Sequence, residues 1–111
     1  MELNTASDVD NGCRLTYVVR NDAGTALLKT SYEVVVFDKN GKVSRFLVLD
    51  FGQLPVGKTR VFRFDVADQT CGDISRLLIN DVDQCETETG KADICIAKLQ
   101  SESRTPIDFG Q

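Results

Sequence analysis

The stretch SYEVVVFDKNGKVSRFLVLDF, residues 31–51, decides the fold class of this chain. Its first part, 31–38, is rich in β-branched and aromatic residues and is apolar on both faces at its centre, as a central strand requires. The turn DKNG (38–41) follows, and asparagine and glycine are the residues that best tolerate positive φ in a tight turn. KVSRFLVLDF (42–51) predicts the partner strand, so the whole stretch indicates a β-hairpin.

Segments on both sides of this hairpin predict further strands. GCRLTYVVR (12–20) alternates apolar and polar residues, and RVFRFDV (60–66) alternates aromatic and charged ones. ISRLLINDV (74–82) fits either a short helix or a strand, and we favour a strand because its neighbours are strands. ADICIAKLQ (92–100) predicts one more. The chain is therefore expected to be all-β, with about six to seven antiparallel strands in a β-sandwich.

Length and composition limit the domain organisation and the possible partners. The chain has 111 residues and 41% hydrophobic residues, which suit a single domain with its own core. We expect a sandwich domain over 12–111 and a flexible polar arm over 1–11. The net charge of −4 argues against nucleic-acid binding, which needs a basic surface. No apolar run approaches the roughly 18 residues of a membrane span, so none is expected.

The segment GQLPVGKT (52–59) matches the spacing of a phosphate-binding loop, from Gly52 to Thr59. Such a loop must lead into a helix whose N-terminus attracts the phosphates. The residues that follow alternate with a period of two instead, and Pro55 removes a backbone donor from the loop. We therefore predict a strand–turn–strand connection here, and we expect no nucleotide binding.

The sequence offers little for catalysis, because it contains no histidine, the commonest general base and transition-metal ligand. We predict no catalytic residues, no cofactor and no enzyme activity. The segment NDVDQCETE (80–88) gathers four acidic residues near one expected turn: Asp81, Asp83, Glu86 and Glu88. This segment is either a solvated acidic loop or a site for a hard cation such as calcium.

The four cysteines, Cys13, Cys71, Cys85 and Cys95, suggest two disulfides and an oxidising compartment. Zinc binding is the first alternative, but the cysteines lack the close pairs of a structural zinc site. Free buried thiols are the second. The polar N-terminus is not a signal peptide. The chain is therefore either cytosolic or a mature exported protein, and the cysteines favour a periplasmic or secreted location.

Three segments resemble the FxLYD type of bacterial immunoglobulin-like domain: VVRNDAGT (18–25), YEVVVFDKNGKV (32–43) and FGQLPVGKTRVFRF (51–64). The matching residues are Asn21, Phe37, Asp38, Gly41, Leu54, Pro55, Gly57 and Phe62. The whole chain also resembles small exported proteins of Gram-negative bacteria. The resemblance implies an immunoglobulin-like β-sandwich, export from the cytoplasm, and no catalytic residues.

The strand order that this resemblance implies predicts how the cysteines pair. In that order Cys13 and Cys71 lie at one end of the sandwich, whereas Cys85 and Cys95 flank the final turn at the other end. We therefore predict Cys13–Cys71 and Cys85–Cys95 disulfides. The expected function is a non-catalytic protein-interaction or structural module with an unknown protein partner. A small periplasmic ligand- or calcium-binding protein that uses the 80–88 loop is the alternative.

Overall fold

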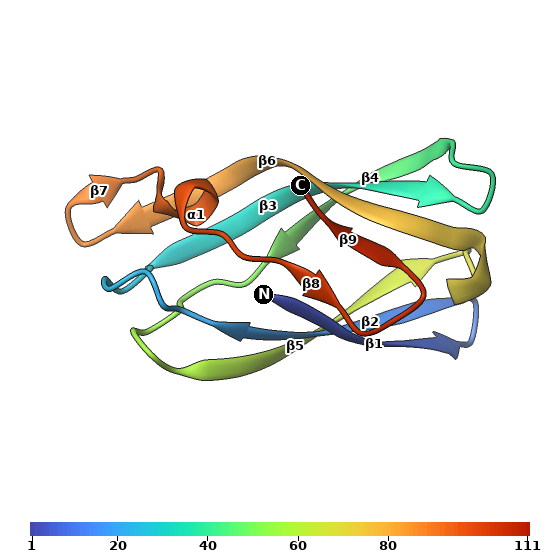
Figure 1. Ribbon diagram of the computed structural model, residues 1–111, viewed down its shortest axis with the longest axis horizontal. Helices are drawn as coiled ribbons and strands as arrows, with labels where there is room; N and C mark the ends of the chain where they lie inside the picture. Colours follow the sequence, from blue (N-terminus) through green and yellow to red (C-terminus); the bar gives the residue numbers. More distant parts are fainter.

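Nine strands in two facing sheets form the structure, a computed structural model that describes residues 1–111 (Figure 1). The all-β sandwich with two disulfides is confirmed. The strands are β1 (Glu2–Val9), β2 (Gly12–Arg20), β3 (Lys29–Asp38), β4 (Val43–Asp50), β5 (Thr59–Ala67), β6 (Ile74–Thr87), β7 (Gly90–Lys91), β8 (Glu102–Ser103) and β9 (Asp108–Gly110). A 3-10 turn, η1 (Cys71–Asp73), and a single helical turn, α1 (Ile94–Ala97), complete the chain. No helix is both long enough and apolar enough to span a membrane.

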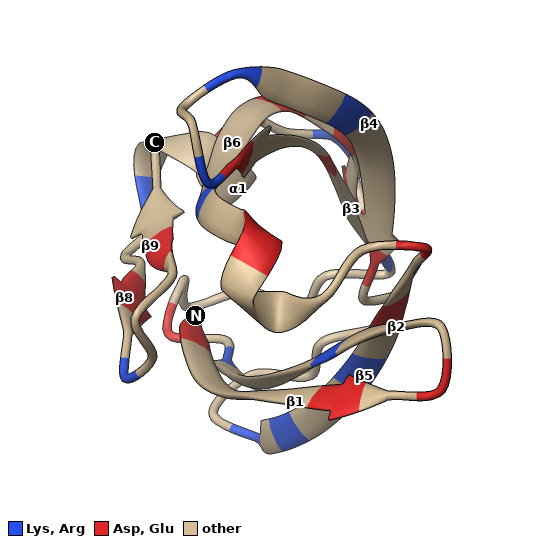
Figure 2. Cartoon of the chain, turned by 90° about the vertical axis from the view of Figure 1, so that its right-hand side faces the viewer, with Lys and Arg blue, Asp and Glu red and all other residues tan.

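The two sheets have different edges, and this difference positions the candidate site. One sheet has the order β5-β2-β1-β8, and the other has the order β4-β3-β6-β7, with β9 also paired to β6. Neighbours pair antiparallel except for β1 with β8 and β6 with β9, which are parallel. Strands β8 and β9 lie side by side on one flank of the sandwich (Figure 2). Strands β4 and β5 are the edges on the other flank.

The predicted hairpin over 31–51 is confirmed as β3 and β4. Its turn closes with a hydrogen bond of 2.7 Å from the amide of Asp38 to the carbonyl oxygen of Lys42. Gly41 adopts a φ of 78°, the left-handed conformation that glycine accepts without strain. The register shifts between Val36 and Phe37, so β4 carries a bulge at Ser44 near its start.

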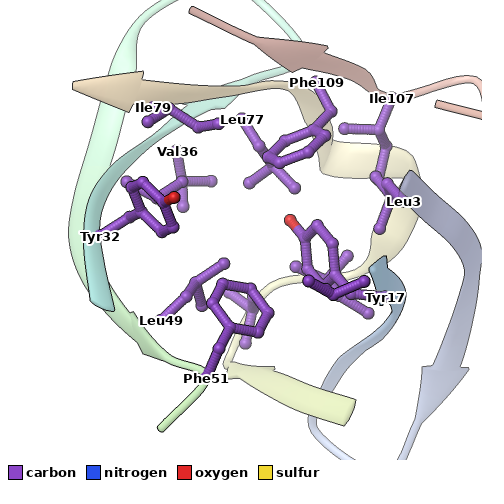
Figure 3. Packing of buried hydrophobic residues seen from close by; sticks show 14 of the residues in the cluster. Leu3, Tyr17, Tyr32, Val36, Leu49, Phe51, Leu77, Ile79, Ile107 and Phe109 are labelled. Atoms are coloured by element: carbon purple, nitrogen blue, oxygen red, sulfur yellow. The ribbon is translucent and has the colours of Figure 1, made fainter. Parts of the chain in front are cut away.

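The core lies between the sheets and is centred on aromatic rings. The alternation predicted for β2 buries one face of that strand, and Tyr17 has no exposed surface. Its ring contacts Phe51 and Phe109 edge to face, with centroid distances of 5.9 and 5.0 Å (Figure 3). Such pairs stabilise a core beyond the burial of their area. The hydroxyl of Tyr17, however, is buried without a hydrogen-bond partner.

The prediction of a flexible arm over 1–11 is wrong, because these residues contain strand β1. Leu3 is fully buried in the core, and β1 pairs with β2 from Glu2 to Val9. Asn11, with a φ of 60°, turns the chain between the two strands. The segment looks like an arm because its strand is held by main-chain hydrogen bonds and places few side chains in the core.

The prediction of a strand over 92–100 is also wrong. The chain leaves the sheet after β7 and forms the single turn α1, in which the amide of Lys98 bonds the carbonyl oxygen of Ile94 at 3.0 Å. The disulfide to β6 places Cys95 in the core beneath this turn. The helical hydrogen bonds of α1 and the disulfide to β6 thus take the place of strand pairing in this segment.

Both predicted disulfides are confirmed, and they lie at opposite ends of the sandwich (Figure 1). Cys13 at the start of β2 joins Cys71 in η1, with the Cα atoms 4.9 Å apart. Cys85 in β6 joins Cys95 in α1, with the Cα atoms 6.0 Å apart. The first disulfide links the two sheets, and the second fixes the C-terminal segment to β6.

Candidate functional site

The Gly52–Thr59 segment follows a strand, as a phosphate-binding loop does, but it leads into a second strand and not into a helix. Leu54 bridges Leu27, and the amide of Lys58 bonds the carbonyl oxygen of Pro55 at 3.3 Å. The chain then enters strand β5 at Thr59, as its alternating sequence predicts. The helix N-terminus that attracts the phosphates in such a loop is therefore not present after the glycines. The motif is a connection between two strands.

Asn21 holds this connection in place. Its side-chain amide donates to the carbonyl oxygens of Leu54 at 2.7 Å and Thr25 at 2.8 Å, and its Oδ1 accepts from the amide of Ala23 at 3.0 Å. Its main-chain oxygen accepts from the amide of Gly57 at 2.9 Å. Asn21 is only 3% exposed. It is therefore a structural residue that ties the turn after β2 to the Gly52–Thr59 segment.

We expect Asn21→Ala to lower the free energy of unfolding by about 2–3 kcal/mol, because it removes the three hydrogen bonds that this buried side chain makes with the main chain. The measurement is urea unfolding followed by circular dichroism. Asn80→Ala is the matched control: Asn80 also donates through its side-chain amide, to Glu33 at 2.8 Å, but it is exposed. The control should stay within about 0.5 kcal/mol of the wild type. Equal effects of the two variants would contradict the structural role of Asn21.

The acidic residues of 80–88 do not gather around a common point, and the expected loop is wrong because most of it lies in strand β6. Asp83 accepts a hydrogen bond from the hydroxyl of Ser31 at 2.9 Å, and Glu86 forms an ion pair with Lys29 at 3.6 Å. Asp81 accepts from a main-chain amide. No three acidic or sulfur-containing side chains come together anywhere in the chain. Asp81, Asp83, Glu86 and Glu88 are therefore not brought together as a cluster of ligands.

A pocket of about 670 Å³ opens at the end of the sandwich beside α1. The hydroxyl of Tyr32 donates to the carbonyl oxygen of Cys95 at 2.8 Å, and burial raises the pKa of this phenol to about 12. On the rim, Arg20 is paired with Asp22 at 2.8 Å. These polar groups already satisfy one another. The buried polar side chains that line the pocket, those of Tyr32 and Asn21, are thus already engaged in hydrogen bonds with the main chain.

Strand β4 presents an unpaired edge with an apolar outer face. It pairs with β3 and with no other strand, so one side of its main chain is free for hydrogen bonds with another strand. Phe46 and Val48 point outward from the sheet and are 63% and 57% exposed. Val35 lies beside Phe46 on β3, and Leu78 lies beside Val35 on β6. An apolar row thus runs across the outer face of the sheet and reaches its edge.

The opposing edge, β5, is protected by charge. Its outward residues include Arg63 and Asp65, and Val61 is the only large apolar residue among them. Arg14 binds Asp65 through two hydrogen bonds of 2.9 and 3.1 Å. These bonds hold the pKa of Asp65 below its usual value. Charged side chains on an edge strand discourage pairing with another chain. The apolar, eight-residue edge of β4 is therefore exceptional within this molecule.

Charge along β4 changes sign from its start to its end. Lys42 precedes the strand and Arg45 follows within it, and neither forms an ion pair. Asp50 ends the strand, and Glu33 on β3 lies beside Val48. Figure 2 shows basic segments on β4 and on the turn before it. The edge is thus basic at one end, apolar in the middle and acidic at the other end.

The sequence predicts strand β4 but does not identify it as a binding surface. The signal is the run FLVL (46–49), in which apolar residues occupy both faces of the strand. A strand with one buried face needs only Leu47 and Leu49 for the core. Comparison with protein-family models, with curated proteins and with solved structures found no match.

Proposed function

We propose that this chain is an exported, immunoglobulin-like module that binds another protein chain through the edge of β4 and carries out no catalysis. The observation that carries the proposal is this long, apolar and unpaired edge, which contrasts with the charged edge at β5. An exposed sheet edge recognises an extended segment by main-chain hydrogen bonds, and neighbouring side chains supply specificity. Phe46 and Val48 are the side chains placed to do so.

The strand connectivity supports the immunoglobulin-like assignment. Strands β1, β2 and β5 share one sheet, and β4, β3 and β6 share the other, which is the partition of the first strands in an immunoglobulin variable-type sandwich. The Cys13–Cys71 disulfide joins β2 to the start of β6, close to the conserved inter-sheet link of antibody domains. The parallel pairing of β9 with β6 departs from that pattern.

The disulfides and the composition support export and the absence of catalysis. All four cysteines are oxidised in the structure, and such pairs persist in the periplasm or outside the cell. The chain contains no histidine for acid–base chemistry. Binding, rather than turnover, is the activity that its surface serves.

Selection of extended peptides from a random display library tests this proposal with two matched variants. Val48→Lys and Val61→Lys change the same residue type at similar exposures of 57% and 63%, on β4 and β5 respectively. We expect the peptides selected on the wild type to bind Val61→Lys equally well and Val48→Lys at least about ten-fold more weakly. Equal binding by the two variants, both confirmed as folded, would contradict the β4 site.

A further inference from the structure

From the charge pattern of β4, we infer that the strand added at this edge is β4 of a second copy, paired antiparallel across a two-fold axis. This inference rests on the proposed function and names its partner. In an antiparallel pair, the start of each strand lies beside the end of the other. The basic start of one β4, at Lys42, then lies near the acidic end of the other, at Asp50. Arg45 faces the core side of the sheet, with Leu47 and Leu49, and takes no part in this pairing of charges. The edge is therefore complementary to itself, as a two-fold interface requires.

The alternation of side chains limits the register of this pair. Residues directly opposite one another must lie on the same face of the joined sheet, so an outward Phe46 must meet an outward residue. Placing the two Leu47 residues on the axis sets each Phe46 opposite Val48 of the second copy. Aromatic and β-branched residues are a favourable cross-strand pair. The four outward side chains then form one continuous apolar cluster.

The bulge in β4 fits the same register. It lies at Ser44, whose hydroxyl bonds Val36 and Gln69 of its own chain at 3.2 and 3.3 Å, so the strand is regular only after this residue. With Leu47 on the axis, Arg45 pairs with Leu49 of the second copy, and only Asp50 at the end of each strand falls opposite Ser44. A register centred on Phe46 would instead place the two bulges within the paired region. The structure thus favours the pairing centred on Leu47.

The charge pattern favours a second copy over a foreign strand. A foreign strand would need apolar residues opposite Phe46 and Val48, an acidic end beside Lys42 and a basic end beside Asp50. Strand β4 itself supplies this pattern in the antiparallel direction. The ends of the edge interact through exposed charges, so added salt is expected to weaken the dimer moderately.

Sedimentation equilibrium of the full chain, from micromolar to millimolar concentration, tests the dimer. We expect the average mass of the wild type and of Val61→Lys to rise towards that of two chains. Val48→Lys should dimerise at least about ten-fold more weakly, since it removes both Phe–Val pairs. Phe46→Gln is a second, uncharged variant with the same expectation. Circular dichroism and thermal unfolding of every variant would confirm that it is folded.

A crosslink tests the register. Chains carrying Phe46→Cys are mixed with chains carrying Val48→Cys, and peptide mapping confirms that the native disulfides are intact. We expect a disulfide between the two chains, and none above background when Val61→Cys replaces Val48→Cys. A dimer with no crosslink between positions 46 and 48 would overturn this register.

A wild-type chain that keeps the mass of one chain at millimolar concentration would overturn the second-copy inference. So would a dimer that Val48→Lys and Phe46→Gln leave unchanged. The proposed function is judged separately, by the binding of the selected peptides. Whether or not the chain dimerises, the proposed function is supported if Val48→Lys weakens peptide binding and Val61→Lys does not. It is contradicted if both variants bind the peptides as the wild type does.

Discussion

We expect the simultaneous replacement of Cys13 and Cys71 by alanine to lower the free energy of unfolding by about 4 kcal/mol. This disulfide joins residues 58 positions apart, so it removes a large amount of conformational entropy from the unfolded chain. Domains of this size unfold with a total of about 5–15 kcal/mol, so the variant loses from about a quarter to most of its stability. Urea unfolding measured by circular dichroism gives the difference directly.

The second disulfide provides the control for this prediction. Cys85 and Cys95 are only 10 positions apart, and replacing both by alanine should lower the free energy of unfolding by about 3 kcal/mol. It should also release α1 from β6, which faster amide exchange over Ile94–Ala97 would reveal. If replacing Cys85 and Cys95 lowered the free energy of unfolding more than replacing Cys13 and Cys71 does, the entropic explanation of the two effects would be wrong.

Alkaline pH should destabilise the chain steeply, beginning near the ordinary tyrosine pKa of about 10. Burial raises the pKa of Tyr32 to about 12 and raises the pKa of Tyr17 further still. Below about pH 10 both phenols are neutral in the folded and unfolded chains, and their contribution to stability is fully present. Above it the unfolded chain loses protons that the folded chain retains, so stability falls as pH rises towards the folded pKa values.

Each of the two tyrosines makes its own contribution to the fall of the free energy of unfolding with pH. Each phenol contributes up to about 1.4 kcal/mol per pH unit, so the pair contributes up to about 2.7 kcal/mol. The measurement is urea unfolding at several pH values, with phenolate absorbance followed in the folded chain. Tyr17→Phe should halve this contribution. A free energy of unfolding that stays level between about pH 10 and 12 would contradict the burial of these hydroxyls.

Tyr17→Phe and Tyr32→Phe should change the free energy of unfolding in opposite directions at neutral pH. The hydroxyl of Tyr17 has no partner, whereas that of Tyr32 bonds the carbonyl oxygen of Cys95. Removing an unpaired buried hydroxyl relieves its cost of desolvation, so Tyr17→Phe should leave stability unchanged or raise it by about 1 kcal/mol. Tyr32→Phe should lower it by about 1–2 kcal/mol.

Local pattern predicted the elements that depend on local chemistry. The DKNG turn (38–41) requires residues that accept particular backbone angles, and its flanking strands alternate, so the β3–β4 hairpin could be predicted. Strand β5 was predicted for the same reason, and its alternation outweighed the phosphate-loop spacing before it. Segment 1–11 was missed because its pairing with β2 uses main-chain groups, which leave little trace in the sequence.

Features that depend on distant partners could not be predicted locally. Asn21 looks like an ordinary turn residue, because its acceptor at Leu54 lies 33 positions away. The run FLVL (46–49) shows that β4 is apolar on both faces, which fits a central strand as well as an edge. Only the order of strands in the sheet shows that β4 is unpaired on one side. The candidate site therefore emerges from topology and exposure together.

Amide hydrogen exchange across the chain tests most directly whether the β4 edge is the binding surface. The exchange of the free chain in dilute solution is compared with that of the chain saturated with a selected peptide or with a second copy at high concentration. We predict slower exchange on binding at the amides of Val43–Asp50 and no change at those of Thr59–Ala67. Slower exchange at the amides of β5, or equally at those of β4 and β5, would contradict binding at the β4 edge.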